Sequence, residues 1–147
     1  MEPVFEDDEL CQAVITSHWR HSKHSGCCPD PAMSRAGENP ACGDLVRLSV
    51  TLEAGLLSCV RHESAGCAVS MASASLVCSG TQGRSPSLAL EYLAAMRAIL
   101  SGREPVAEPG EAAALRLLSA NPARIRCALV AIGLMESLCH EATLSAS

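Results

Sequence analysis

The sequence predicts a mixed fold in which a small antiparallel sheet packs with several helices in one domain. In two adjoining segments, Leu45–Glu53 and Leu56–Ser64, apolar and polar residues alternate with a period near two, as they do in half-buried strands. Five other segments are typical of helices, through apolar residues at helical spacing or capping residues at their ends. The chain has 147 residues, 48% of them hydrophobic, which is enough for one core and gives no sign of a second.

The first 38 residues divide into a helix and a loop. Residues 7–20 carry apolar residues at helical spacing and acidic residues in the first turn, where the helix dipole favours them. Residues 21–38 are rich in Gly, Pro, Ser and Asn, which indicates a loop that can hold one short edge strand.

The two strands are expected to form a hairpin that turns at Ala54-Gly55. Strict alternation along the second strand would place Leu57 on the same face as Cys59 and Arg61. Such a hairpin makes the sheet antiparallel.

A long helix is expected from Cys67 to about Gln82. Gly66 allows the sharp change from strand to helix, and Cys67 then lies in the first helical turn. Unpaired backbone N–H groups and the helix dipole favour a thiolate there. The position suits a nucleophile or a metal ligand.

Three further helices complete the predicted elements. One runs from about Ser85 to Ser101, with proline at its start and glycine after its end, and a shorter one covers Glu111–Ser119. The last opens with Asn121 as N-cap before a proline and extends to about His140. Cys127 falls in its second turn.

Charge and hydropathy argue against two classes of partner. The net charge of −5 and the scattered arginines predict no nucleic-acid binding, which draws on a basic patch. The longest uncharged stretch, Ser64–Gly83, contains too many polar residues for a good membrane span. Residues 1–9 are acidic where a signal peptide is basic and then apolar, so we expect a cytoplasmic protein.

Nine cysteines are an odd number and an unusual density. In a reducing cytosol they are metal ligands, reactive thiols or small buried hydrophobes more often than disulfides. The sequence contains no Cys-x-x-Cys pair, which removes zinc ribbons, ferredoxin-type clusters and thioredoxin-like motifs from consideration.

The turn at residues 39–44 brings a thiol and a carboxylate together. Pro40 and Gly43 bend the backbone so that Cys42 and Asp44 can point into one space at the mouth of the first strand. Cys67 and Cys127, at two helix starts, lie 25 and 60 residues further along.

Three thiolates and one carboxylate would suit a closed tetrahedral zinc site. Arg124, one helical turn before Cys127, could offset the negative charge of this set. The alternative is that these cysteines are buried structural residues, the more common use of a cysteine.

The remaining cysteines divide by geometry. Cys78 lies about 16 Å along the helix from Cys67, and Cys139 about 18 Å from Cys127, so both are predicted core residues. Cys11 is expected to be structural, and Cys59 to pack under a helix. The vicinal pair Cys27-Cys28 belongs to a solvated loop or, as the alternative, binds metal or reacts.

Three motifs follow one another along the chain: Asn39-Pro40-Ala41-Cys42-Gly43-Asp44, Gly66-Cys67 with Ser70-Met71-Ala72-Ser73-Ala74-Ser75, and Pro122-Ala123-Arg124-Ile125-Arg126-Cys127-Ala128. In this order they resemble the SufU/IscU-type (NifU N-terminal-like) iron–sulfur cluster assembly family, over most of the chain. The resemblance implies one domain over residues 1–147 with an α+β fold: about three antiparallel strands packed against four to five helices.

Two details resemble the zinc-binding SufU type in particular. Arg126 stands where the scaffold type commonly has a histidine, and the 60-residue gap before Cys127 holds the extra segment of the sulfur-transfer type. The resemblance then implies zinc held by Cys42, Asp44, Cys67 and Cys127.

The implied function is zinc-dependent sulfur acceptance. A pyridoxal-phosphate cysteine desulfurase of the SufS type would deliver persulfide sulfur to Cys42. The desulfurase would free Cys42 from the zinc by supplying a replacement ligand. A downstream assembly scaffold would then receive the sulfur. Arg124 would tune the charge of the site. The loop His21–Gly26 departs from the family's Asn-Pro-Arg-Asn-like run, which bears on the choice of partner.

Two alternatives stay open. The same ligands could assemble a [2Fe–2S] cluster on a scaffold, a reading that Arg126 weakens. The chain could also be a structural or adaptor protein whose cysteines are only buried.

Overall fold

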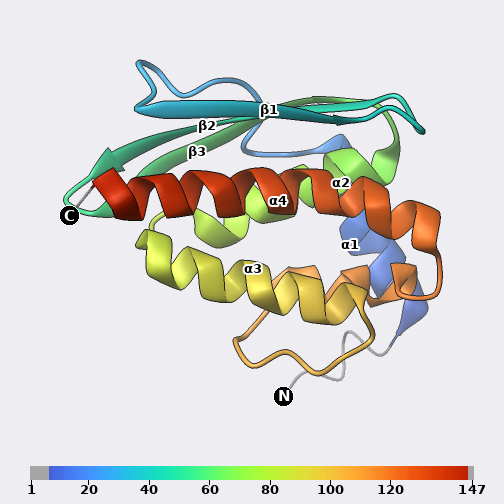
Figure 1. Cartoon of the computed structure of the whole chain (residues 1–147). Helices are drawn as coiled ribbons and strands as arrows, with labels where there is room; N and C mark the ends of the chain where they lie inside the picture. The colour runs from blue at the N-terminus through green and yellow to red at the C-terminus, as the bar shows by residue number, and fades with distance from the viewer. Residues whose placement is uncertain (1–6, 146–147) are drawn as a thin grey trace.

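A three-stranded antiparallel sheet in the order β1-β2-β3 forms one outer layer of the molecule in this computed structural model, which describes residues 7–145 (Figure 1). The strands are β1 (Met33–Asn39), β2 (Asp44–Glu53) and β3 (Leu56–Ala65). The α+β class, the hairpin at Ala54-Gly55 and the third strand are therefore confirmed.

Strand β1 is the edge strand that the predicted loop 21–38 could hold, and it ends one residue beyond that loop, at Asn39. Its residues run antiparallel to β2 from Met33 opposite Val50 to Asn39 opposite Asp44. The strand is mostly exposed and contains Arg35, Gly37 and other residues that give no apolar alternation. Its pairing with β2, and not its own pattern, makes it a strand.

A β-bulge changes the faces of β3. Thr51 pairs with Cys59 but Leu52 pairs with Leu57, so Ser58 is an extra residue in the ladder. Leu57 is consequently buried on the same side as Val60. The expectation that Leu57 shares a face with Cys59 is wrong for this reason.

Five helices accompany the sheet. They are α1 (Asp8–Arg20), α2 (Ala68–Thr81), α3 (Pro86–Leu100), η2 (Gly110–Leu118) and α4 (Pro122–Ser145). Asp7, Cys67 and Ser85 cap three of these helices with their side chains. Two predictions need correction: η2 is a 3₁₀ helix, and α4 continues five residues beyond His140 because its buried face goes on to Ala142.

The helices pack in two layers on one face of the sheet (Figure 1). Helices α2 and α4 contact the strands. Helix α3 lies on the side of α4 that faces away from the sheet, and it contacts both α4 and η2. Leu48, Leu76, Leu93 and Ile132 come from different elements and meet in the core. Helix α4 is long and apolar enough to cross a membrane by length and composition alone, and 44% of its most apolar window is buried inside the protein.

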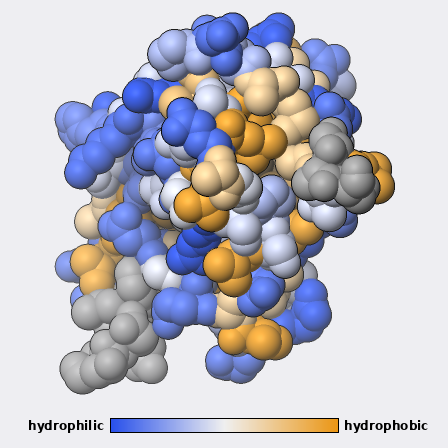
Figure 2. Space-filling model, turned by 90° about the vertical axis from the view of Figure 1, so that its left-hand side faces the viewer, coloured by the Kyte–Doolittle hydropathy of each residue, from blue (hydrophilic) through white to orange (hydrophobic). Residues whose placement is uncertain are grey.

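The two ends of the sheet differ. The β1–β2 turn, the start of α2 and the start of α4 gather at one end, and the β2–β3 hairpin lies at the other (Figure 1). Figure 2 looks at the hairpin end, where hydrophobic residues gather in the upper centre of a mostly hydrophilic surface. The predicted site residues are at the first of these ends.

Candidate metal centre

Three elements position the predicted ligands. Cys42 belongs to the turn that closes β1 onto β2, Asp44 is the first residue of β2, and Cys127 lies near the start of α4. Gly43, with φ of +72°, makes the tight turn between the first two possible. Residues far apart in the sequence thus reach one end of the sheet.

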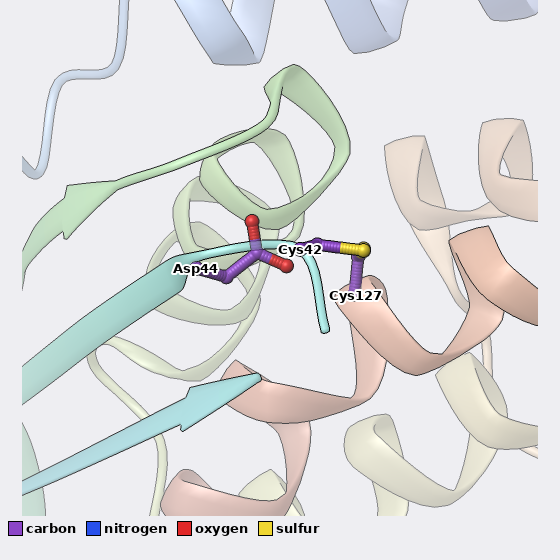
Figure 3. A group of neighbouring side chains, drawn as sticks. All are labelled: Cys42, Asp44 and Cys127. Carbon is purple, nitrogen blue, oxygen red and sulfur yellow. The ribbon is translucent and has the colours of Figure 1, made fainter. Parts of the chain in front are cut away.

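The ligand atoms of Cys42, Asp44 and Cys127 all lie within 4.8 Å of one another. Figure 3 shows the three side chains converging from the turn, the strand and the helix. Asp44 and Cys127 are buried, whereas Cys42 is exposed. The arrangement offers two sulfurs and a carboxylate oxygen to one ion.

The Asp44 carboxylate is fully buried and only half satisfied. Its Oδ1 accepts a hydrogen bond from the backbone N–H of Cys67 at 2.9 Å. Its Oδ2 is buried and has no hydrogen-bond partner in the described structure. A buried carboxylate oxygen without a partner is costly unless a cation or a donor meets it. The free oxygen therefore fits a metal ligand.

Gly66 makes the position of Asp44 possible. Its φ is +130°, and a Cβ there would lie 2.7 Å from the Cα of Asp44 and would also meet Oδ1. Gly66 therefore does more than allow the turn from strand to helix that the sequence predicts. Its closeness to Asp44 depends on the pairing of β2 with β3, which brings Leu45 opposite Ala65.

Cys67 borders this group without joining it fully. It is the N-cap residue of α2, and its sulfur accepts a hydrogen bond from the backbone N–H of Ser70 at 3.4 Å. Its side chain is near enough to Cys127 to help raise the pKa of that thiol. In the part of the chain that the structure describes, Cys67 is not among the ligand atoms that lie within 4.8 Å of one another.

Burial dominates the electrostatics of Cys127. Loss of solvent, followed by the neighbouring side chains of Asp44, Cys42 and Cys67, raises the pKa of its thiol well above the ordinary range. The Asn39 side-chain amide also donates to the Cys127 sulfur at 3.7 Å. Without a cation, this sulfur holds its proton, so metal binding must release it.

Arg124 is not drawn into the site. Its side chain is exposed, and its backbone N–H donates to Asn121 Oδ1 at 3.2 Å, which confirms Asn121 as the N-cap of α4. Within residues 7–145 no hydrogen bond or ion pair joins its guanidinium to the four predicted ligands. Arg126 is exposed as well.

The other cysteines follow the predictions in part. Cys11, Cys78 and Cys139 are fully buried core residues, as expected. Cys59, however, does not lie under a helix: it is half-buried and contacts Cys28 from the preceding loop. Cys28 itself is buried and Cys27 exposed, so only Cys27 matches a solvated loop.

Sequence reasoning missed two contributors to the site. Asn39 was noted as part of the turn, but its donation to Cys127 was not expected. The contact of Gly66 with Asp44 was missed in the same way. A polar residue and a glycine next to two predicted ligands are the signals that could have pointed to both.

Comparison with known proteins shows the family of the chain. Residues 10–117 match the family described as NifU-like N terminal domain. The chain is 32% identical over 123 residues to the zinc-dependent sulfurtransferase SufU of Bacillus subtilis (strain 168), covering 82% of this chain and 83% of that protein. It is 29% identical over 126 residues to the iron–sulfur cluster assembly scaffold protein IscU of Streptococcus pyogenes serotype M1, covering 84% and 79%.

A solved structure shows the same fold. A putative iron–sulfur cluster assembly scaffold protein for the SUF system from Fervidobacterium islandicum AW-1 superposes with a TM-score of 0.76 at 23% identity, covering 84% of this chain and 91% of that one. Its low identity makes it evidence for the fold alone.

Proposed function

The chain belongs to the NifU-like N-terminal domain family of iron–sulfur cluster assembly proteins, and from this premise we propose that it is a zinc-dependent sulfur acceptor. In this proposal, Cys42, Asp44, Cys67 and Cys127 hold zinc, and Cys42 accepts sulfur from a cysteine desulfurase. The reaction would take place in the cytoplasm, where thiols stay reduced.

One observation carries the proposal. The Asp44 carboxylate is fully buried, and its Oδ2 lacks a hydrogen-bond partner although it lies beside two sulfurs. If these cysteines were only structural, nothing would offset the cost of burying a carboxylate oxygen without a hydrogen-bond partner beside them. Zinc, which takes Cys and Asp ligands in tetrahedral sites, fits this donor set.

The ligands would have unequal roles. Zinc would keep the bound sulfurs deprotonated at neutral pH. Cys42 lies on an exposed turn, while Asp44 and Cys127 are buried and Cys67 is half-buried. Only Cys42 is thus accessible to a large partner, which makes it the acceptor, and the other three residues would keep their positions.

Sulfur transfer then requires one displacement. The Cys42 thiolate attacks the outer sulfur of a persulfide on the desulfurase. A new sulfur–sulfur bond forms on Cys42, the old one breaks, and the desulfurase cysteine leaves as a thiolate. No net oxidation occurs, because the persulfide sulfur moves from one thiolate to another.

Arg124 has a place in this proposal. Its exposed guanidinium near the start of α4 adds positive charge on the side of Cys127 and could meet an acidic partner there. Arg124→Ala is therefore expected to lower the rate of sulfur transfer while leaving metal content unchanged.

Metal content tests the proposal directly. Protein purified without added metal should carry about one zinc per chain by mass spectrometry, and Asp44→Ala should carry much less. Cys139→Ala is the matched control: Cys139 is buried in the same helix as Cys127 but far from the site. Equal zinc in the wild type and Asp44→Ala would contradict the proposed ligand set.

Desulfurase activity tests the role of Cys42. The wild type should stimulate a pyridoxal-phosphate cysteine desulfurase, and Cys42→Ala should abolish the stimulation. Cys27→Ala, which removes another exposed cysteine, should leave it intact. Stimulation by Cys42→Ala at the wild-type level would refute the acceptor role.

A second function has support of its own, namely the 29% identity to an IscU scaffold protein. On this alternative, the same residues assemble a [2Fe–2S] cluster. Anaerobic reconstitution with iron and sulfide separates the two: a stable visible absorption lost in Cys127→Ala favours the scaffold, and its absence favours sulfur transfer.

A further inference from the structure

A second pair of thiols meets on the face of the sheet that the helices do not cover. The sulfurs of Cys28, in the loop before β1, and Cys59, in β3, lie 2.7 Å apart. Both are free thiols. A disulfide bond needs about 2.0 Å between sulfurs, so a small movement would join them.

The backbone holds the loop in this position. Gly26 donates to the carbonyl of His62 at 2.8 Å at the edge of β3, and Ala32 donates to the carbonyl of Val50 at 2.9 Å beyond β1. Between these two anchors the chain crosses the sheet from one edge to the other. The loop is therefore attached to the sheet on both sides of Cys28.

Cys28 is also fixed individually. Its backbone N–H donates to the Ser49 side chain at 2.9 Å, and its thiol lies 3.4 Å from the Ser49 carbonyl. It is 2% exposed. Thr51, the neighbour of Cys59 across the sheet, is on the same side as Ser49, so Cys28 and Cys59 face each other there. The contact is built into the fold.

The two thiols have different surroundings. Burial raises the pKa of Cys28, which stays protonated. The guanidinium of Arg61 lies beside Cys59, and this contact raises the pKa of Arg61. Cys59 is the more exposed of the two, so a small oxidant in solution reaches its sulfur before that of Cys28. Cys59 is thus the thiol that reacts first.

The pair is independent of the metal centre. Asp44 and Thr51 stand at opposite ends of β2, about 23 Å apart along the strand. Among the described residues no third cysteine, histidine or acidic ligand atom completes a metal-binding group with these two. Two thiols without further ligands are suited to a disulfide and not to a tetrahedral ion.

We propose that Cys28 and Cys59 are a redox-active pair that hydrogen peroxide converts to a disulfide, which links the loop before β1 to β3. The Cys59 thiol gives up its proton as its sulfur attacks one peroxide oxygen to form a sulfenic acid, and the other oxygen takes that proton and leaves as water. The Cys28 sulfur then attacks the sulfenic sulfur, and its hydroxyl leaves as a second water. Two thiols lose two electrons and two protons, and the peroxide gains both.

Peptide mapping tests this pair on the full-length protein. The protein is treated with a slight excess of hydrogen peroxide, free thiols are alkylated, and trypsin is added without reductant. Cleavage at Lys and Arg places Cys28 in peptide 24–35 and Cys59 in peptide 48–61. We expect these two peptides to appear as one cross-linked species, lighter by two hydrogens than their sum and separated by a reductant.

Variants assign the cross-link to its cysteines. Cys27 shares peptide 24–35 with Cys28, so Cys27→Ser is the matched control and should keep the cross-link. Cys28→Ser and Cys59→Ser should each lose it. Fragmentation of the wild-type species needs no variant to fold: Cys27 should be alkylated and Cys28 should not.

Three results would overturn the proposal. The first is that peroxide produces no link between 24–35 and 48–61. The second is a link through Cys27. The third is a link to peptide 62–84, which contains Cys67 and Cys78 and would make one of these two cysteines the partner instead.

Discussion

At the scale of single residues, Gly66 determines whether Asp44 can occupy its buried position. A methyl group on Gly66 would meet the Asp44 carboxylate and Cα, and the backbone there has a φ of +130° that other residues rarely adopt. Gly66→Ala should therefore displace Asp44, lower the zinc content and reduce the free energy of unfolding by roughly 1–3 kcal/mol. Metal analysis and urea denaturation measure both.

Gly55→Ala is the matched control for this change. Gly55 also has a positive φ, +78°, but nothing lies within 4 Å of an added Cβ. It should cost about 1 kcal/mol of stability through backbone strain and leave zinc binding intact. If both variants lose the metal equally, the contact between Gly66 and Asp44 is not the cause.

His62 makes the stability depend on pH. Its ring is buried between the hydroxyls of Ser22 and Ser64, at 2.8 and 2.7 Å. Burial, followed by repulsion from His24, lowers its pKa to about 4, whereas an unfolded histidine has a pKa of about 6.5. The unfolded chain thus binds more protons between these values, and stability falls as the pH drops from about 6.5 to 4.

The variant His62→Gln should remove most of this pH dependence. In the wild type, His62 should lower the free energy of unfolding by up to about 3 kcal/mol as the pH falls from about 6.5 to 4. Urea midpoints measured between pH 7 and 4 give the difference between the two proteins. His140→Gln, a change at an exposed histidine, should follow the wild type; a His62→Gln curve that also follows the wild type would refute the role of His62.

At the scale of elements, the contact of α2 with α3 depends on Gly80. The Tyr92 ring packs directly against Gly80, and its hydroxyl donates to the Leu76 carbonyl at 2.8 Å. An added Cβ at Gly80 would overlap the ring. Gly80→Ala should therefore separate the two helices and cost more than about 2 kcal/mol, measured by urea denaturation.

Gly133 in α4 provides the opposite case. No atom lies within 4 Å of a Cβ built there, and the residue is in the middle of a helix. Gly133→Ala should raise stability by about 0.5–1 kcal/mol, because alanine favours the helix. Similar effects at Gly80 and Gly133 would mean that helix propensity, and not the Tyr92 contact, governs both positions.

At the scale of the whole molecule, the candidate metal centre brings together distant parts of the chain. The β1–β2 turn, the start of α2 and the start of α4 all contribute to it. A bound ion stabilises the folded state by mass action, by about 2.7 kcal/mol at a hundred times its dissociation constant. Removing zinc with a chelator should therefore lower the Tm by about 5–10 °C.

Asp44→Asn is the control for the chelator experiment. This variant keeps the shape of the side chain but lacks the charge, so it should bind zinc weakly and melt at the same temperature with and without chelator. A wild-type Tm that does not respond to chelator would contradict the structural role of the metal.

The sequence by itself determined the elements whose signals are local. The alternation of Leu45–Glu53, the proline at the start of the Ser85–Ser101 helix, the N-cap Asn121 and the glycine before Cys67 each predicted a feature that the structure contains. Capping and periodicity depend on residues only a few positions apart, so both can be recognised in the sequence alone. The three motifs with Cys42, Cys67 and Cys127 identified the family for the same reason.

The tertiary structure alone decided the features that depend on contacts between distant residues. Strand β1 exists because β2 offers it a partner, and the bulge at Ser58 turns Leu57 inward. The crossing of the loop over the sheet buries Cys28 and brings it to Cys59. Pairing and packing of this kind involve residues that are far apart in the chain, and no local pattern records them.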